Sequence, residues 1–434
     1  MSPLTIGFAG LAVMIVLLLA RLPVGVTLGV VAIAGVWLLV GERAALGLLN
    51  EIPYEFVAHW TLSSVPMFLL MGYVSFRAGL TEGLFRAARL WLGGLPGGLA
   101  ITTIGGAAAF SAVTGSSVAC AAAMGRIALP EMLRYRYDPA LASGAVAAAG
   151  TLGSLIPPSI ILLIYGVFAE VPISRLFVAG ILPGLLTAVL YAAMVVVRVR
   201  ITPALAPSAR EPATARQKLA ALGETWPVIL MIVGVFGGLF GGLFTPTEAG
   251  AVGALLALVI AAAKRTLSFE SFRQAVSETL HSTAAIFIIA IGAQLLTRFL
   301  ALSGVPEYLA EAVAVEGGGE IALVLGFSLA YLALGMFLDP IGIMLLTLPI
   351  ILPVAEAVHM DLIWLGILLT KYLEIALITP PVGLNVFVVR AAAPDIATTT
   401  IFRGIAWFVA TDLVTVALLI AFPAISLALP RLLG

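Results

Sequence analysis

Long apolar segments follow one another along almost the whole chain, separated by short polar stretches. Each is about as long as a membrane-crossing helix, which needs roughly 20 apolar residues. The apolar residues form continuous runs rather than alternating with polar ones, which favours helices over strands. The runs lie at about residues 4–20, 24–40, 61–76, 140–156, 176–197, 226–244, 248–263, 283–300, 321–337, 362–379 and 405–422. Leu46–Trp60, by contrast, is typical of an amphipathic segment at a membrane surface.

The composition agrees with this pattern. Apolar residues make up 62% of the 434 residues and charged residues 10%, whereas soluble domains average about 45–50% and about 25%. Soluble globular and disordered chains are therefore excluded. Lys+Arg and Asp+Glu both number 22, so no excess charge is available for binding nucleic acid. With roughly a dozen to sixteen full or partial spans, we expect an all-α polytopic protein embedded in the lipid bilayer.

Two apolar segments are interrupted near their middle by residues that break a helix. Leu99–Gly125 contains Thr114–Ser117, and Ile321–Val354 contains Leu338–Pro340. Breaks at membrane depth free backbone groups, which must be satisfied by neighbouring helices or by a cavity lined with water or ions. We therefore predict two re-entrant helical hairpins with these residues at their tips.

The two halves of the chain carry the same landmarks in the same register. A shift of 223 residues superimposes the two interruptions, and it also aligns Leu129-Pro130 with Leu352-Pro353, Asp138 with Asp361, and Pro157-Pro158 with Pro380-Pro381. Broken segments at corresponding positions of two halves are typical of secondary transporters. The chain is thus predicted to contain an internal repeat built around the two hairpins.

The distribution of charge predicts how the two repeats are oriented. Arginines flank the first hairpin on both sides, whereas no Lys or Arg lies between Arg298 and Lys371, around the second hairpin. Because basic loops stay in the cytoplasm, the hairpins should enter from opposite sides, as an inverted repeat. We expect a single membrane-embedded unit over 1–434, with scaffold helices at 1–90 and 223–310, a first repeat at 91–197, a cytoplasmic linker at 198–222 and a second repeat at 311–434.

The tip of the first hairpin offers oxygen atoms to a cation. Ser116 and Ser117 supply hydroxyls beside Gly115, and the free carbonyls at a helix end add negative potential. Hard cations such as sodium bind at such broken helices in transporters. The alternative is small-residue packing, in which the hydroxyls bond back to their own helix. The matching interruption in the second half favours the cation site.

Paired prolines open two further helices. At 157–158 and 380–381 they remove amide donors and clash with the preceding turn, although a simple kink is the alternative. Three hydroxyls beside these breaks favour ligation of a cation, those of Thr151, Ser159 and Thr379. Asn385 can donate to an anionic or hydroxylated solute. The candidate contacts of a solute are Ser116, Ser117, Ser159, Thr379 and Asn385.

Carboxylates within or beside apolar segments have two kinds of interpretation. Asp339 either ligates a cation, because a buried charge suggests a function, or caps the helix that begins at Pro340, and both alternatives stay open. Thr245–Ala249 is typical of a capping arrangement at a helix start. Glu374 is expected to form a structural ion pair with Lys371, one turn earlier.

Residues for enzymatic catalysis are not grouped in this sequence. Cys120 is the only cysteine, and the three histidines are far apart. A serine hydrolase using Ser116 or Ser117 would need a base within reach, so we expect neither an enzyme nor an organic cofactor. A passive channel is the other alternative, but an inverted repeat with broken helices favours alternating access.

At these residues the chain resembles the large membrane subunit of tripartite ATP-independent periplasmic (TRAP) transporters, the dicarboxylate-type, DctM-like permease. The resemblance covers nearly the whole chain. It is carried by AAFSAVTGSSVACAAAMGRIALPEM (108–132), YDPALASGAVAAAGTLGSLIPPSI (137–160), FTPTEAGAVGA (244–254), LGMFLDPIGIMLLTLPIILPV (334–354) and EIALITPPVGLNVFVV (374–389).

The resemblance implies a sodium-driven elevator transporter, in which a transport domain with two hairpins slides past a fixed scaffold. It also implies two partners, a small membrane subunit and a periplasmic solute-binding protein. The implied solute is a small organic acid (a dicarboxylate, a keto acid or an acidic sugar), and the implied location is the bacterial inner membrane. The two sodium sites map onto Gly115, Ser116, Ser117, Thr151 and Gly153, and onto Leu338, Asp339, Ala376 and Thr379.

Overall fold

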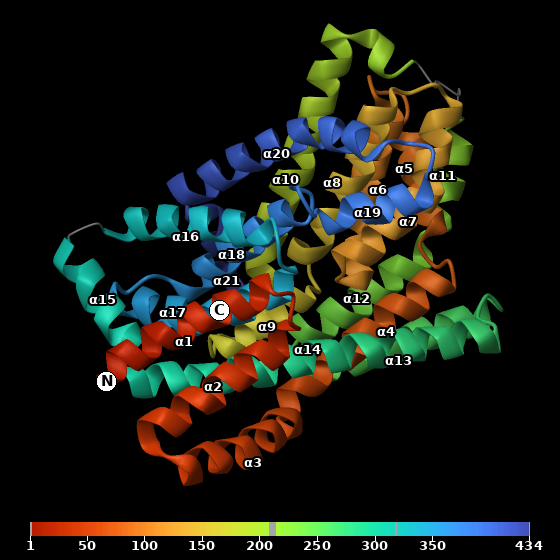
Figure 1. Ribbon diagram of the computed structural model, residues 1–434. Helices are drawn as coiled ribbons and strands as arrows, with labels where there is room; N and C mark the ends of the chain where they lie inside the picture. The colour runs from red at the N-terminus through yellow and green to blue at the C-terminus, as the bar shows by residue number, and fades with distance from the viewer. Residues whose placement is uncertain (1, 208–213, 317–318, 434) are drawn as a thin grey trace.

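The computed structural model describes residues 2–207, 214–316 and 319–433, and every regular element in these ranges is helical. The helices form two groups, and in Figure 1 most of the second group lies above most of the first. The first group, the scaffold, comprises α1 (Pro3–Leu19), α2 (Val24–Val40), α3 (Glu42–Ala58), η1 (Trp60–Ser63), α4 (Ser64–Arg77), α12 (Trp226–Phe240), α13 (Pro246–Ala263) and α14 (Phe269–Ser303).

The second group, the hairpin bundle, contains both interrupted segments and the connections beside them. Its N-terminal half comprises α5 (Glu82–Leu92), α6 (Gly98–Thr114), α7 (Ser117–Arg134), α8 (Pro139–Leu155), α9 (Ile160–Phe168), α10 (Ile173–Ile201), η2 (Pro203–Leu205) and α11 (Ala215–Gly223). Its C-terminal half comprises α15 (Val305–Glu316), α16 (Gly319–Gly335), α17 (Pro340–Ala357), α18 (Leu362–Ala376), α19 (Leu384–Ala392), α20 (Thr398–Ala421) and α21 (Ala424–Leu433).

The scaffold is held together along the long helix α14. This helix packs against α2 and α4, and α13 also packs along α4. Glycines allow α2 and α14 to touch through their backbones: a Cβ added to Gly25 would lie 2.6 Å from the carbonyl oxygen of Ile288. Such small-residue contacts are the usual way for helices to approach closely in a membrane.

Helix α8 is the centre of the hairpin bundle. Every residue from Ala140 to Leu155 is buried, because α6, α7 and α20 surround it (Figure 1). Its sequence is rich in Ala and Gly, which lets all three neighbours come close. The break that ends α8 therefore follows a fully buried helix.

The apolar runs of the sequence correspond to helices of this fold. Among the described residues, six helices are long and apolar enough to cross a membrane, or eight if each of two bent pairs is one span. The other predicted crossings are shorter or broken helices, such as α1 and α2. One bent pair joins α3 to the η1–α4 segment at 57°. The side chains of Tyr54 and Trp60 beside this bend are exposed, as expected for aromatic residues at a membrane surface.

The internal repeat is confirmed by helix boundaries and caps. Helices α7 and α17 start at Ser117 and Pro340 and have 18 residues each, so they keep the shift of 223. Asp138 caps α8, accepting from the Leu141 amide at 2.9 Å, and Asp361 caps α18, accepting from the Ile363 amide at 2.9 Å. Both interruptions form the turn of a hairpin, as predicted.

The two hairpins differ in how they pack. Helix α6 lies against α7, whereas α16 packs mainly on α18, and α17 packs on α14 and α15. The predicted linker at 198–222 also has structure of its own, because α10 continues to Ile201 and α11 forms after it. Residues 208–213 of that linker lie outside the described residues.

The capping arrangement predicted at Thr245–Ala249 is confirmed. The Thr245 hydroxyl accepts from the Glu248 amide at 3.3 Å, and the Glu248 carboxylate accepts from the Thr245 amide at 2.8 Å. This reciprocal pair satisfies two amides at the start of α13. Both side chains are therefore accounted for by local structure.

Candidate functional site

Both hairpin tips and both helix breaks open into one cavity of about 440 Å³. The bundle contributes the first tip (Gly115–Val118), the first break (Ser154, Ile160 and Ile161), the second tip (Asp339–Ile341) and the second break (Leu377 and Leu384). The scaffold contributes Leu69 and Tyr73 of α4, and Ser282, Ala285, Ile286 and Ile289 of α14. The cavity thus lies between the two groups of helices, and we call it the tip cavity.

The first tip rests directly on the first break. Gly115 has φ +60°, a left-handed conformation that favours glycine, and a Cβ there would lie 2.3 Å from the carbonyl oxygen of Pro158. The Ile160 amide donates to the Gly115 carbonyl at 3.4 Å. Ser116 caps α7, and its hydroxyl accepts from the Ala119 amide at 3.4 Å.

Ser117 joins the first tip to helix α8. Its hydroxyl donates to the carbonyl oxygen of Thr151 at 3.2 Å and also hydrogen-bonds to the Ser154 hydroxyl. Gly153 allows this contact, because a Cβ there would lie 2.7 Å from the backbone carbon of Ser116. The first predicted ligand set, Gly115, Ser116, Ser117, Thr151 and Gly153, is therefore brought together in space.

In the first predicted ligand set, the side chain and the backbone of Thr151 have different partners. The Thr151 hydroxyl donates to Ala148 of its own helix at 2.7 Å, while the Thr151 carbonyl faces Ser117. Ser154 lines the tip cavity, although the sequence analysis did not select it. No local signal distinguishes Ser154 from other small residues of α8, because only the crossing of α7 and α8 brings it to Ser117.

The second tip is built around Asp339. The Asp339 carboxylate accepts from the Gly342 amide at 2.8 Å and caps α17, so the capping alternative is confirmed. Asp339 also lines the tip cavity, and ligation of a cation stays a prediction.

The other members of the second predicted ligand set lie beside Asp339. Leu338 precedes it, and Ala376 lies against the same hairpin, because a Cβ on Gly335 would be 2.3 Å from the Ala376 Cβ. The Thr379 hydroxyl donates to Ile375 of the preceding turn at 2.6 Å.

Three predicted solute contacts lie outside the lining of the tip cavity: Thr379, described above, and Ser159 and Asn385. The Ser159 hydroxyl donates to the Ser154 carbonyl and accepts from the Leu162 amide at 3.2 Å, so it caps α9. The Asn385 amide nitrogen donates to the Ala147 carbonyl at 3.1 Å. Both side chains are buried, and in this arrangement they connect parts of the bundle.

The scaffold adds a polar pair that the sequence analysis did not find. The hydroxyls of Tyr73 on α4 and Ser282 on α14 are 2.8 Å apart, and both residues line the tip cavity. They face the two hairpin tips from the opposite side. Ser282 stands between His281 and Thr283, and Tyr73 shares α4 with other polar residues, so neither gives a distinct signal until the helices are placed together.

A buried charged cluster connects α18 with α20 and α10. The Lys371 ammonium is 2.9 Å from a Glu374 oxygen and 2.7 Å from Asp412 Oδ1. The Tyr191 hydroxyl donates to Asp412 Oδ2 at 2.7 Å, and all four side chains are buried. The predicted ion pair of Lys371 with Glu374 is therefore confirmed, and Asp412 and Tyr191 complete what we call the Lys371 cluster.

Comparison with known proteins identifies the family. Residues 11–425 match the family described as "Tripartite ATP-independent periplasmic transporter, DctM component". The chain belongs to this DctM family. It is 36% identical over 386 residues to the C4-dicarboxylate TRAP transporter large permease protein DctM of Pseudomonas aeruginosa, and the match covers 88% of each chain. It is 32% identical to the sialic acid TRAP transporter large permease protein SiaM of Vibrio cholerae, with 96% of each chain covered.

A solved structure shows the same fold at low sequence identity. The YdaH transporter of Alcanivorax borkumensis superimposes with a TM-score of 0.60 at 14% identity, over 91% of this chain and 90% of that one. The DctM family and these relatives are transporter permeases, so the expectation of a non-enzyme is confirmed. This TRAP transporter large permease is a multi-pass membrane protein.

Proposed function

We propose that this DctM-family permease imports a small organic acid together with sodium, by an elevator movement of the hairpin bundle against the scaffold. The tip cavity carries the proposal, because both tips and both breaks line one side of it and α4 and α14 line the other. Its volume of about 440 Å³ falls within the range of about 300–1,000 Å³ for small-molecule sites. A solute bound there would contact both moving parts.

Oxygen atoms at the tips support sodium as the coupling ion. The first set gathers the Ser116 and Ser117 hydroxyls with the backbone carbonyls of Gly115, at the end of α6, and of Thr151, in the last turns of α8. The second set pairs Asp339 at the tip with the end of α18, near Ala376 and Thr379. Helix ends that present carbonyls in a membrane are typical binding places for such ions.

The solute class and the partners are inferred from the family. One relative is named for a C4-dicarboxylate and another for sialic acid, and both names describe acids. The family description names a tripartite periplasmic transporter. We therefore infer a small membrane subunit, a periplasmic solute-binding protein and a bacterial inner membrane location.

Reconstitution tests coupling and partners together. In proteoliposomes that contain the small subunit and receive the loaded binding protein, an inward sodium gradient should drive uptake, and a proton gradient without sodium should not. The permease alone should give negligible uptake of free solute. Equal uptake under a proton gradient alone would contradict sodium coupling, and robust uptake by the permease alone would contradict the tripartite mechanism.

Ser117→Ala is expected to weaken sodium binding without unfolding the protein. It removes one hydroxyl from the first set, whereas the carbonyl of Thr151 and the small size of the side chain are kept. Loss of one charge-assisted contact costs about 1–2 kcal/mol, so the sodium concentration for half-maximal uptake should rise about 5- to 30-fold.

Matched variants separate ligation from packing. Ser116→Ala and Thr379→Ala remove the other candidate hydroxyls at the two tips, and Ser117→Leu keeps no hydroxyl but adds volume. A packing role predicts that alanine is neutral and leucine damaging. If all three alanine variants keep the parent's sodium dependence, the hydroxyls are not ligands.

A further inference from the structure

A second and larger cavity lies next to the tip cavity along the same helices. Its volume is about 830 Å³. Helix α4 contributes Tyr73 to the tip cavity and, one turn later, Phe76 and Arg77 to the second cavity. Helix α7 likewise passes from Val118 at the first to Arg126 at the second. The second cavity therefore lies further along α4 and α7 than the tip cavity, at their arginine-bearing positions, and we call it the basic cavity.

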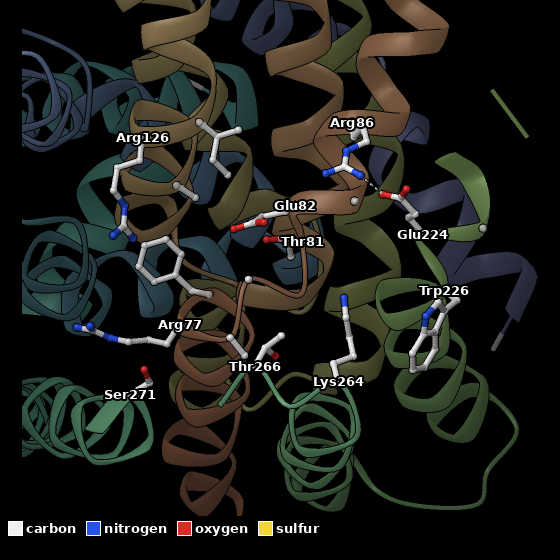
Figure 2. Close-up of a pocket in the computed structure, with 17 residues that line it drawn as sticks. Arg77, Thr81, Glu82, Arg86, Arg126, Glu224, Trp226, Lys264, Thr266 and Ser271 are labelled. Carbon is white, nitrogen blue, oxygen red and sulfur yellow. Dashed lines mark hydrogen bonds and ion pairs between the residues drawn. The ribbon is translucent and has the colours of Figure 1, made fainter. Parts of the chain in front are cut away.

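Cationic side chains outnumber carboxylates in the basic cavity. Its lining contains four cations, Arg77, Arg86, Arg126 and Lys264, and two carboxylates, Glu82 and Glu224. Two of the cations are already neutralised: Arg86 pairs with Glu224 at 2.8 Å, and Arg77 pairs with Glu278 of α14. Figure 2 shows the first of these pairs at the edge of the cavity.

The remaining two cations have no carboxylate partner in the described part of the chain. The Arg126 guanidinium lies over the Phe76 ring at 4.3 Å, and Lys264 follows the last turn of α13. Figure 2 shows both side chains extending beside the cavity, with Thr81 and Glu82 between them. Two unpaired cations and one carboxylate leave a net positive charge where an anion can enter.

We propose that the basic cavity is a carboxylate-binding vestibule, in which Arg126 and Lys264 hold an anion that has left the tip cavity. The identification of the anion as an organic acid rests on the proposed function, whereas the site itself rests on the lining charges. Lys264 follows the end of α13 and Arg126 lies in the middle of α7, among basic residues that the positive-inside rule assigns to the cytoplasmic side. A cavity lined by one sign of charge also concentrates ions of the opposite sign.

The two cations come from different parts of the molecule. Arg126 belongs to the hairpin bundle and Lys264 to the scaffold. An anion bound between them stabilises the arrangement in which the two parts are close, since a ligand favours the state that binds it better. A high concentration of the solute in the cytoplasm is therefore expected to slow further import by retaining this arrangement.

Cysteine labelling measures the charge of the basic cavity without any transport. Thr266 is exposed and lines the cavity, so a cysteine in its place reports the local electrostatic potential. The variant is Thr266→Cys in a background where the buried Cys120 is replaced by Ala. The purified protein is reacted with a negatively charged and a positively charged methanethiosulfonate. We expect the rate with the negative reagent, divided by the rate with the positive reagent, to fall in Arg126→Gln and in Lys264→Gln. The scale is roughly fivefold for the loss of a unit charge about 8 Å away in water.

Two control variants should change the ratio of the labelling rates in the opposite direction or leave it unchanged. Glu82→Gln removes the unpaired carboxylate and should raise the same ratio. Arg134→Gln neutralises an exposed arginine of α7 outside the lining and should leave it unchanged. Unchanged ratios in both Arg126→Gln and Lys264→Gln would overturn the proposal.

Ligand protection tests the anion itself. Succinate should slow labelling of Thr266→Cys in nonionic detergent, uncharged succinamide should not, and Arg126→Gln should abolish the protection. Protection that arises only when anionic lipid is added would overturn the proposal in favour of a lipid headgroup site. Labelling needs no sodium gradient, so the two proposals can fail separately. Sodium-dependent uptake without protection by succinate contradicts only the carboxylate-binding vestibule. Protection without sodium-dependent uptake contradicts only the proposed coupling.

Discussion

Replacement of Lys371 by methionine should lower the stability of the folded permease by about 3–5 kcal/mol. The ammonium has 0% exposure and lies within 3 Å of two carboxylates, those of Glu374 and Asp412. Without it, two acidic groups remain buried with no cation, and each must keep an uncompensated charge or take up a proton. Unfolding of the purified protein in detergent, followed by intrinsic fluorescence, measures the loss.

The loss should be recovered when the carboxylates are neutralised as well. The triple variant Lys371→Met, Glu374→Gln, Asp412→Asn has no buried charge in the cluster, and replacing a whole buried ion group is often neutral. Lys264→Met, at an exposed lysine, should change stability by no more than about 0.5 kcal/mol. A Lys371→Met variant as stable as Lys264→Met would show that the cluster does not hold its charges as the distances indicate.

Gly153→Ala should have the second largest effect, on stability and on transport together. An alanine Cβ would lie 2.7 Å from the backbone carbon and 2.8 Å from the backbone oxygen of Ser116, so the first tip must move away from α8. Overpacking of this kind costs about 1–3 kcal/mol. Uptake should fall at least about tenfold, because binding sites tolerate displacements of only about 0.5 Å.

A matched glycine provides the control for this substitution. Gly29 lies in helix α2, where a Cβ would meet only Leu295 Cδ1 at 3.8 Å, an ordinary contact. Gly29→Ala should be neutral or stabilising by up to about 1 kcal/mol, since alanine favours the helix. Thermal unfolding with and without sodium compares the two variants. Equal tolerance of both substitutions would contradict the close contact between tip and break.

The Lys371 cluster shows where sequence reasoning reaches its limit. Lys371 and Glu374 lie three residues apart on one helix, so their pairing follows from helical geometry. Asp412 and Tyr191 lie on α20 and α10, at 41 and 180 residues from Lys371, and no periodicity connects them. The charge balance of the cluster is therefore visible only after three helices have packed.

The same limit applies to the tip cavity. The two tips and the two breaks were predictable, because Gly, Pro and paired polar residues are local signals within apolar runs. Ser154, Tyr73 and Ser282 were not, because no local signal separates each of them from the other small or polar residues of its helix. The basic cavity was also hidden: its arginines were visible in the sequence as markers of the cytoplasmic side, but not as the lining of one space.

By itself, the sequence determined the class of protein, the helices, the hairpin tips and the register of the repeat. Apolar length, helix-breaking residues and a constant shift of 223 residues are properties of the chain that do not depend on packing. Tertiary structure alone decided which oxygens face a cavity. A serine hydroxyl can bond to its own helix or across to another. The crossing of α7 with α8 joins Ser117 to Thr151 at the edge of the tip cavity, whereas Ser159 and Asn385 bond within the bundle away from it.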